Sequence, residues 1–219
     1  MNEKFAELLE IMFGDGCLSK YSNCYIVYIS GHKADDLDYH STTICGLFKD
    51  VFNKKTHVNI RNDEQTLITR FSDKEIFAKI SSYMPIGKKY DKLKVPSEIL
   101  NDRKYFFAFM RGFVDTDGTI IFSKQHKNHP YYPRIEIASI SKSLLCTLLS
   151  ELEKYGFYGS VSRKTEKSCR LEMPGQKNLR KWFELIGFNN SKNIRKIKSH
   201  LRGLETPLDR LELSTLRLL

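Results

Sequence analysis

The chain contains one 12-residue segment twice, at a constant spacing. Residues 5–16 read FAELLEIMFGDG and residues 107–118 read FAFMRGFVDTDG, so that both copies end on an Asp-Gly pair. Each copy places apolar residues at helical spacing. Because glycine after a last helical residue commonly adopts the left-handed conformation, we expect Gly16 and Gly118 to end the two helices in that way. Two copies in phase predict a pseudo-symmetric molecule made of two equivalent halves.

The residues that follow each copy also repeat a pattern of short alternating runs and amphipathic stretches. In the first half we expect strands at 17–20 and 25–30, a helix at 34–52, strands at 56–61 and 66–71, and a helix at 73–82. In the second half we expect strands at 119–124 and 131–140, a helix at 142–155, strands at 158–164 and 168–173, and a helix at 176–186.

These elements predict an α+β fold of two αββαββα half-domains. The first half-domain covers residues 1–83 and the second covers residues 103–219, including a tail that is basic as far as Arg202. A lysine-rich segment with prolines, residues 84–102, is expected to link them.

The charge balance favours a polyanionic partner. The chain has 36 Lys and Arg residues against 26 Asp and Glu, a formal net charge of +10. Such an excess attracts phosphates without regard to sequence. The five cysteines form no C-x-x-C pair, so we expect them to be buried small residues in a reducing compartment rather than a zinc site or disulfide framework. The N-terminus resembles no signal peptide and no apolar run is long enough for a membrane span, so we expect an intracellular, cytoplasmic or organellar protein.

The two repeated segments identify a family. Residues 8–16 and 110–118 resemble the two copies of the LAGLIDADG motif, and residues 95–118 resemble the interdomain segment of single-chain, archaeal-style members. Residues 181–189 resemble the C-terminal half of those proteins. The resemblance implies two curved antiparallel sheets that form a saddle over duplex DNA. It further implies an intron-encoded homing endonuclease, active as a monomer, that cuts both strands of a long DNA site and leaves staggered ends.

The resemblance also implies which residues act. Asp15 and Asp117 would be the catalytic, metal-binding carboxylates, and the backbone carbonyls of Gly14 and Thr116 would help to hold the metal. Phosphodiester hydrolysis needs an activated water and charge relief at the leaving oxygen, which Mg²⁺ supplies and for which Mn²⁺ is expected to substitute. One Asp-Gly helix end alone would be read as a simple turn, whereas two in phase favour catalysis.

The first motif departs from the second at one position. Glu10 stands where the second copy has Gly112, a residue that the family uses for close helix approach. A buried carboxylate is costly unless it is paired. We therefore expect Glu10 to lean to the edge of the interface, toward Arg111.

Strand alternation selects the side chains that would face DNA. In the third strand Val58 and Ile60 should face the helices, and in the fourth Thr66 and Ile68 should lie on the DNA face. Near turns and strand ends, basic residues could contact phosphates, and a basic residue beside the metals would be one of Lys20, Arg70, Lys124 or Arg170. The full set of expected DNA contacts is Lys20, His57, Asn59, Arg61, Arg70, Lys124, Arg134, Glu136, Arg163, Lys164 and Arg170, with Ser168 and Glu172 on the same strand face.

A non-cleaving protein on the same scaffold is the main alternative. It would act as an intron RNA maturase or as a DNA-binding regulator, and only the acidic pair separates it from a nuclease. Because Met1 lies close to the first motif and no splicing-type Cys, Ser or Thr starts the chain, we expect a freestanding protein rather than an intein fragment. No H-N-H metal cluster is present that would indicate another nuclease class.

Overall fold

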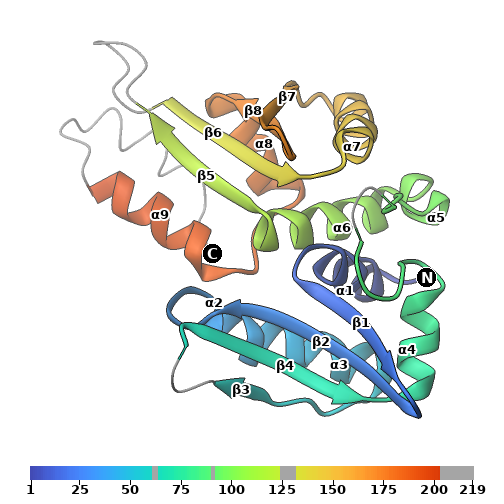
Figure 1. The fold of residues 1–219 in the computed structure, drawn as a ribbon. Coiled ribbons are helices and arrows are strands. Elements are labelled where there is room, and N and C mark those ends of the chain that lie inside the picture. Colours follow the sequence, from blue (N-terminus) through green and yellow to red (C-terminus); the bar gives the residue numbers. More distant parts are fainter. Residues whose placement is uncertain (61–63, 90–91, 124–131, 203–219) are drawn as a thin grey trace.

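Each repeated segment forms a helix at the centre of the molecule. The computed structural model describes residues 1–60, 64–89, 92–123 and 132–202. Helices α1 (Glu3–Gly14) and α6 (Arg103–Thr116) pack against each other between the two halves (Figure 1). Both begin at a polar residue whose side chain accepts hydrogen bonds from the first turn: Asn2 from the Phe5 N–H, and Asp102 from the N–H groups of Lys104 and Tyr105.

The remaining elements follow the predicted order in both halves. The first half contains β1 (Gly16–Tyr21), β2 (Cys24–His32), α2 (Lys33–Tyr39), a π-helical turn (His40–Ile44), α3 (Cys45–Phe52), β3 (Val58–Ile60), β4 (Thr66–Ser72) and α4 (Lys74–Ser81). The linker contains a short helix, α5 (Ser97–Leu100). The second half contains β5 (Gly118–Ser123), β6 (Tyr132–Ser139), α7 (Lys142–Lys154), β7 (Ser160–Thr165), β8 (Ser168–Pro174), α8 (Gln176–Leu185) and α9 (Ser191–Arg202). The αββαββα pattern predicted for each half is therefore confirmed.

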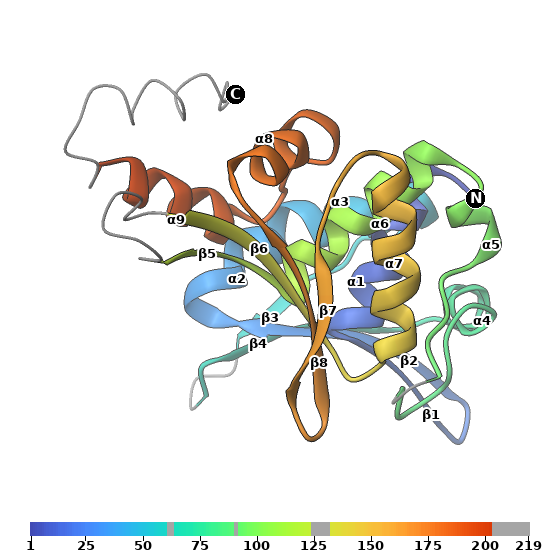
Figure 2. The same ribbon diagram turned by 90° about the horizontal axis from the view of Figure 1, so that it is seen from above.

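The two four-stranded sheets share one topology. Their strand orders are β1-β2-β4-β3 and β5-β6-β8-β7, with antiparallel pairing throughout. Gly16 lies opposite Ile29 in the first sheet and Gly118 lies opposite Ile137 in the second, so the registers match as well. Helices α2 and α3 lie on one side of the first sheet and leave its other side open (Figure 2).

One continuous apolar core runs through both halves. Phe13 of α1 packs edge-on against Phe109 of α6, with ring centroids 5.7 Å apart, so the two motif helices join the core of one half to that of the other. Trp182 is fully buried and its indole N–H donates to the Gly187 carbonyl at 2.9 Å. Burial of this apolar surface is the main stabilising term of the fold. No helix in the described part of the chain is both long and apolar enough to cross a membrane.

Three sequence-based expectations were wrong. Gly16 and Gly118 do not adopt positive φ; glycine is needed there because an added Cβ would lie 2.5 Å from the Cα of Met12 or of Val114 in the preceding turn. The single helix predicted for residues 34–52 is interrupted by the π-helical turn at His40–Ile44. The cysteines are not all buried, because Cys24 and Cys146 are exposed, although all five are free thiols.

Candidate functional site

The two motif aspartates end their helices in the same geometry. Asp15 and Asp117 have backbone angles of φ −90°, ψ −4° and φ −89°, ψ −1°, and each carbonyl accepts a 3.2 Å hydrogen bond from the following hairpin, from Ser30 and Ala138 respectively. Both carboxylates therefore come from helix C-termini, where the helix dipole disfavours negative charge. A site made of two such ends favours a bound cation.

The helix ends lie close together because glycines permit it. A Cβ added to Gly14 would lie 2.6 Å from the Thr116 hydroxyl and 3.0 Å from Oδ2 of Asp117. A Cβ added to Gly112 would lie 2.8 Å from the Glu7 carbonyl. The carboxylate of Asp117 therefore lies beside Gly14 of the first motif, close enough to Asp15 for that charge to raise its pKa, and the two candidate carboxylates belong to one site.

The pKa values of the carboxylates at this site are raised. Desolvation by the surrounding protein and then the charge of Asp15 raise the pKa of Asp117 to about 7, even though the side chain still reaches solvent. Burial also raises the pKa of Asp15. The pKa of the fully buried Glu10 lies well above its usual value because of burial and then the charges of Asp117 and Asp15. Burial and the neighbouring carboxylates thus disfavour the ionised forms of these groups.

Glu10 does not lie where the sequence suggested. Arg111 pairs with Glu7 at 2.8 Å and donates to the Ile186 carbonyl at 3.0 Å, so it leaves Glu10 inside the interface. One carboxylate oxygen of Glu10 accepts from the Thr116 hydroxyl at 3.3 Å, and the other has no hydrogen-bond partner among the described residues. The expectation that Glu10 turns toward Arg111 was wrong because Glu7, one turn earlier, reaches Arg111 first.

Two lysines donate hydrogen bonds to the C-terminal carbonyls of the motif helices, Lys89 to those of α1 and Lys192 to that of α6. Lys89, after α4, donates from Nζ to the carbonyls of Phe13 at 2.7 Å and of Gly14. Lys192, at the start of α9, donates from Nζ to the Thr116 carbonyl at 3.3 Å. Both charges lower the pKa of Asp117, against the larger opposite effect of desolvation. The sequence did not identify either lysine as a site residue; their shared position after the helix that follows the second hairpin of each half was the signal available.

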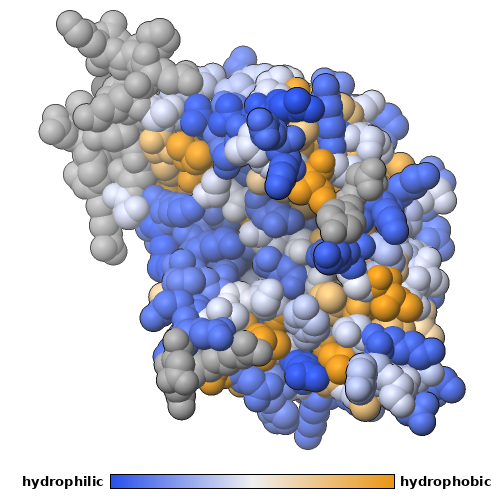
Figure 3. All heavy atoms as spheres, in the orientation of Figure 1, coloured by the Kyte–Doolittle hydropathy of each residue, from blue (hydrophilic) through white to orange (hydrophobic). Residues whose placement is uncertain are grey.

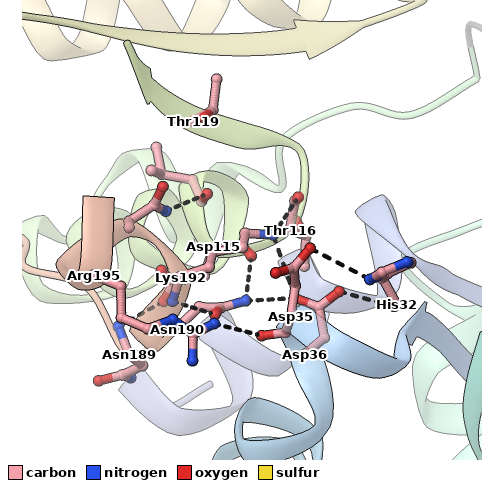
Figure 4. Close-up of polar contacts among 12 residues, drawn as sticks. His32, Asp35, Asp36, Asp115, Thr116, Thr119, Asn189, Asn190, Lys192 and Arg195 are labelled. Carbon is pink, nitrogen blue, oxygen red and sulfur yellow. Dashed lines mark hydrogen bonds and ion pairs between the residues drawn. The ribbon is translucent and has the colours of Figure 1, made fainter. Parts of the chain in front are cut away.

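A buried polar network holds Lys192 in place and joins the two halves (Figure 4). Asp36 of α2 accepts from Asn190 at 2.9 Å and from Lys192 at 3.5 Å. Although burial opposes it, the backbone N–H of His32 and then these two partners lower the pKa of Asp36. Asp115, fully buried, accepts from the Asn189 N–H at 2.7 Å. The network fixes the start of α9 against the end of α6.

The oxygen atoms at the helix ends are the groups that could hold a metal. Hard divalent cations such as Mg²⁺ bind carboxylate and carbonyl oxygens. No cluster of three or more His, Cys, Asp or Glu residues with metal-binding geometry occurs within the described ranges. A cation here would therefore depend on Asp15, Asp117 and the carbonyls of Gly14 and Thr116. The raised carboxylate pKa values and the unpartnered oxygen of Glu10 fit such a cation.

The open faces of the two sheets carry most of the side chains expected to read DNA. In the first sheet Asn59 and Arg70 are exposed, and the partly exposed Ile68 lies opposite Asn59. Val58 and Ile60 lie opposite the buried Thr69 and Leu67, on the helix-covered side as predicted, although Ile60 is 41% exposed at the sheet edge. In the second sheet Arg134, Glu136, Arg170 and Glu172 form ion pairs with one another.

The other expected DNA contacts lie at strand ends. Lys20 is exposed near the β1–β2 turn, with Nζ 5.3 Å from the centre of the Tyr25 ring. His57, Arg163 and Lys164 are also exposed, and Arg163 pairs in register with the buried Cys169. Arg61 and Lys124 lie outside the described residues. The surface over α9 and the junction between the halves is largely hydrophilic (Figure 3).

Comparison with known proteins agrees with this geometry. Residues 105–187 match the model of the LAGLIDADG-like domain. The replication factor C small subunit of Methanocaldococcus jannaschii is 27% identical over 95% of this chain, which spans only 11% of that protein.

Two solved structures share the fold. The homing endonuclease I-DmoI, in complex with DNA and Mn, matches 84% of this chain and 96% of its own with a TM-score of 0.60 and 19% identity. The full-length DUF199/WhiA protein from Thermatoga maritima matches 95% of this chain and 63% of its own with a TM-score of 0.59 and 15% identity. The chain thus contains a LAGLIDADG-like domain at residues 105–187 and shares the two-motif, single-chain fold of these structures, with two motif helices that meet at one acidic site between two equivalent halves.

Proposed function

We propose that this protein is a homing endonuclease: a monomeric, site-specific enzyme that cuts both strands of a long duplex DNA site and leaves staggered ends. The observation that carries the proposal is the contact between the two motif ends. Asp15 and Asp117 come from different halves and share one site, so each half can supply a carboxylate for one DNA strand.

The chain's own residues would bind and orient the substrate. The open sheet faces would lie along the major groove, which accepts a β-ribbon and distinguishes all four base pairs. Lys89 and Lys192 would place positive charge beside the scissile phosphates, where negative charge develops during hydrolysis. A bound Mg²⁺, for which Mn²⁺ should substitute, would supply water activation and charge neutralisation.

A binding protein without cleavage is the alternative, acting on DNA as a regulator or on intron RNA as a maturase. One observation favours it. Lys89 and Lys192 already donate to the carbonyls of Gly14 and Thr116, two of the groups expected to hold a metal. A protein that only binds nucleic acid could keep this arrangement permanently.

The test is cleavage of a randomised duplex DNA pool with Mg²⁺, followed by sequencing of the cut ends. The intact chain should yield one long, partly degenerate site with staggered ends. The Asp15→Asn and Asp117→Asn variants should not cut, but should bind the same site within a few-fold, because each carboxylate holds metal rather than DNA. Asp50→Asn, at an exposed position, is the matched control and should cut normally.

Two outcomes would contradict the proposal. If the intact chain does not cut but enriches a duplex site by binding, the alternative replaces the nuclease. If Asp15→Asn or Asp117→Asn keeps full activity, the catalytic site lies elsewhere.

A further inference from the structure

The open faces of the two sheets differ in chemistry at four equivalent positions. Because the registers of the two sheets match, Ile26 in β2 is equivalent in position to Arg134 in β6, and Tyr28 is equivalent to Glu136. In β4 and β8, the neighbouring strands, Ile68 is equivalent in position to Arg170, and Arg70 is equivalent to Glu172. Four charged residues in the second half thus replace two isoleucines, a tyrosine and an arginine in the first half.

In the second sheet the four charged residues neutralise one another. Arg134 lies 2.8 Å from Glu136 and 3.3 Å from Glu172. Arg170 lies 3.3 Å from Glu136 and 3.1 Å from Glu172. These contacts form a closed ring in which each charge has two opposite neighbours, and Glu136 is only 5% exposed as a result. The polar groups of this ring suit the donors and acceptors of base edges.

In the first sheet the same positions surround a hollow. Ile26, Tyr28 and Ile68 are partly exposed, and they alternate along their strands with buried residues that face the helices. The cavity has a volume of about 340 Å³ and is lined by Ser19, Ile26, Tyr28, Ile68 and Arg70. The hollow therefore combines two isoleucine side chains and a tyrosine ring with the Ser19 hydroxyl and the exposed Arg70, on the face proposed to meet DNA.

The isoleucine side chains of the hollow are complementary to an apolar group in the major groove of DNA. In the major groove every base edge presents polar donors or acceptors, and thymine is the only base of unmodified DNA that also presents a methyl group there. Isoleucine side chains on an open sheet face offer no hydrogen bond to a base but do offer contact to a methyl group. Arg70, at the same border, can reach a neighbouring phosphate or guanine edge.

We propose that this hollow binds the 5-methyl group of a pyrimidine in the major groove and so makes one half of the target site methyl-dependent. The proposal rests on the proposed function, because it requires that the open sheet faces contact duplex DNA. The ligand is thymine in ordinary DNA and 5-methylcytosine in modified DNA. The ion-pair ring makes the other half of the site insensitive to this methyl group, so the target is asymmetric.

The experiment measures binding without divalent metal, so that no cleavage occurs. A site is first selected from a randomised duplex pool with the intact chain, and each thymine is then replaced by uracil, which lacks only the methyl group. At one or two positions in one half of the site, uracil should weaken binding about fourfold, the effect expected for loss of one buried methyl group. Cytosine at these positions should bind better when it is methylated at C5.

Two variants assign the effect to the hollow. Ile68→Thr keeps a β-branched residue on the strand and replaces part of its apolar surface with a hydroxyl group, so it should reduce the preference for the thymine duplex over the uracil duplex. Ile121→Thr is the matched control, because Ile121 lies opposite Arg134 on the open face of the second sheet. It should keep the preference for thymine.

The outcomes separate this proposal from the proposed function. If a duplex site is selected but uracil changes binding nowhere in it, or if Ile68→Thr keeps the thymine preference, the methyl site is wrong and DNA binding stands. If no duplex site is selected at all, both are overturned.

Discussion

The hydroxyl of Thr116 in α6 donates a 3.3 Å hydrogen bond to the carboxylate of Glu10 in α1. Each residue stands where the other motif copy has glycine, since Glu10 matches Gly112 and Thr116 matches Gly14. Glu10 packs on Gly112, and Thr116 packs on Gly14. The two departures from internal symmetry are therefore complementary, and the side chain added in one helix fills the space that glycine leaves in the other.

This complementarity predicts a stability cost at Gly112. In Gly112→Ala the new methyl group would lie 2.8 Å from the Glu7 carbonyl, a backbone atom that cannot move alone. We expect the free energy of unfolding in urea to fall by about 2 kcal/mol, as for overpacked interfaces. The control is Gly46→Ala in α3, where an added Cβ meets no atom within 4 Å. It should raise stability by about 0.5–1 kcal/mol through helix propensity, and equal effects of the two variants would contradict close packing at Gly112.

Asp115 predicts a dependence of stability on pH. Burial raises the pKa of this carboxyl group from its usual 3.8 to about 7, against hydrogen bonds from Asn189 and Asn190 that lower it. Between these two pH values the folded protein binds a proton that the unfolded chain has released, so the free energy of unfolding falls as pH rises from 4 to 7. Asp115→Asn stays neutral and should reduce that fall by up to about 1.4 kcal/mol per pH unit.

Denaturant unfolding at several pH values between 4 and 8 checks this prediction. Asp50→Asn is the control, because the pKa of Asp50 is lowered by its hydrogen bond to Lys4 and the group is exposed. It should leave the fall between pH 4 and 7 unchanged. Identical pH profiles for the intact chain and Asp115→Asn would mean that folding does not raise the pKa of Asp115.

Most of the fold could be predicted from the repeated motif and the pattern that follows it, whereas the remaining features depend on tertiary contacts. Apolar periodicity was enough to predict both motif helices and all four hairpins, because it reflects which face each element buries. It could not find Lys89, whose contact with the end of α1 depends on how the linker folds back over 75 residues. Alternation placed Arg134 and Glu136 on the open sheet face, but ion pairing between strands is not visible in a single strand. The sequence also could not show that Glu7, rather than Glu10, pairs with Arg111.

Lys89 predicts a shift in the pH dependence of cleavage. Its positive charge favours the ionised form of Asp117, the form that would hold a cation. Lys89→Met should therefore raise the pKa of Asp117 further, move the acidic limb of the cleavage profile to higher pH, and lower cleavage at neutral pH about a hundredfold. Lys92→Met, at an exposed linker position, is the control and should leave the profile unchanged. A loss of activity with no shift of the acidic limb would mean that Lys89 acts without influencing Asp117.

The net charge of +10 predicts that DNA binding weakens steeply with salt. Each phosphate neutralised by a lysine or arginine releases counterions, so the logarithm of the binding constant should fall linearly with the logarithm of salt concentration. The slope for duplex DNA is about −0.9 per phosphate contact. Fluorescence anisotropy of the selected duplex, measured without divalent metal, gives this slope.

Two variants test the origin of the slope. Lys164→Gln, at an exposed strand end, should reduce the magnitude of the slope by about the value of one phosphate contact if this lysine contacts a phosphate. Ile68→Thr should weaken binding without changing the slope, because a methyl contact releases no ions. A flat salt response of the intact chain would show that the basic surface does not contact the DNA backbone.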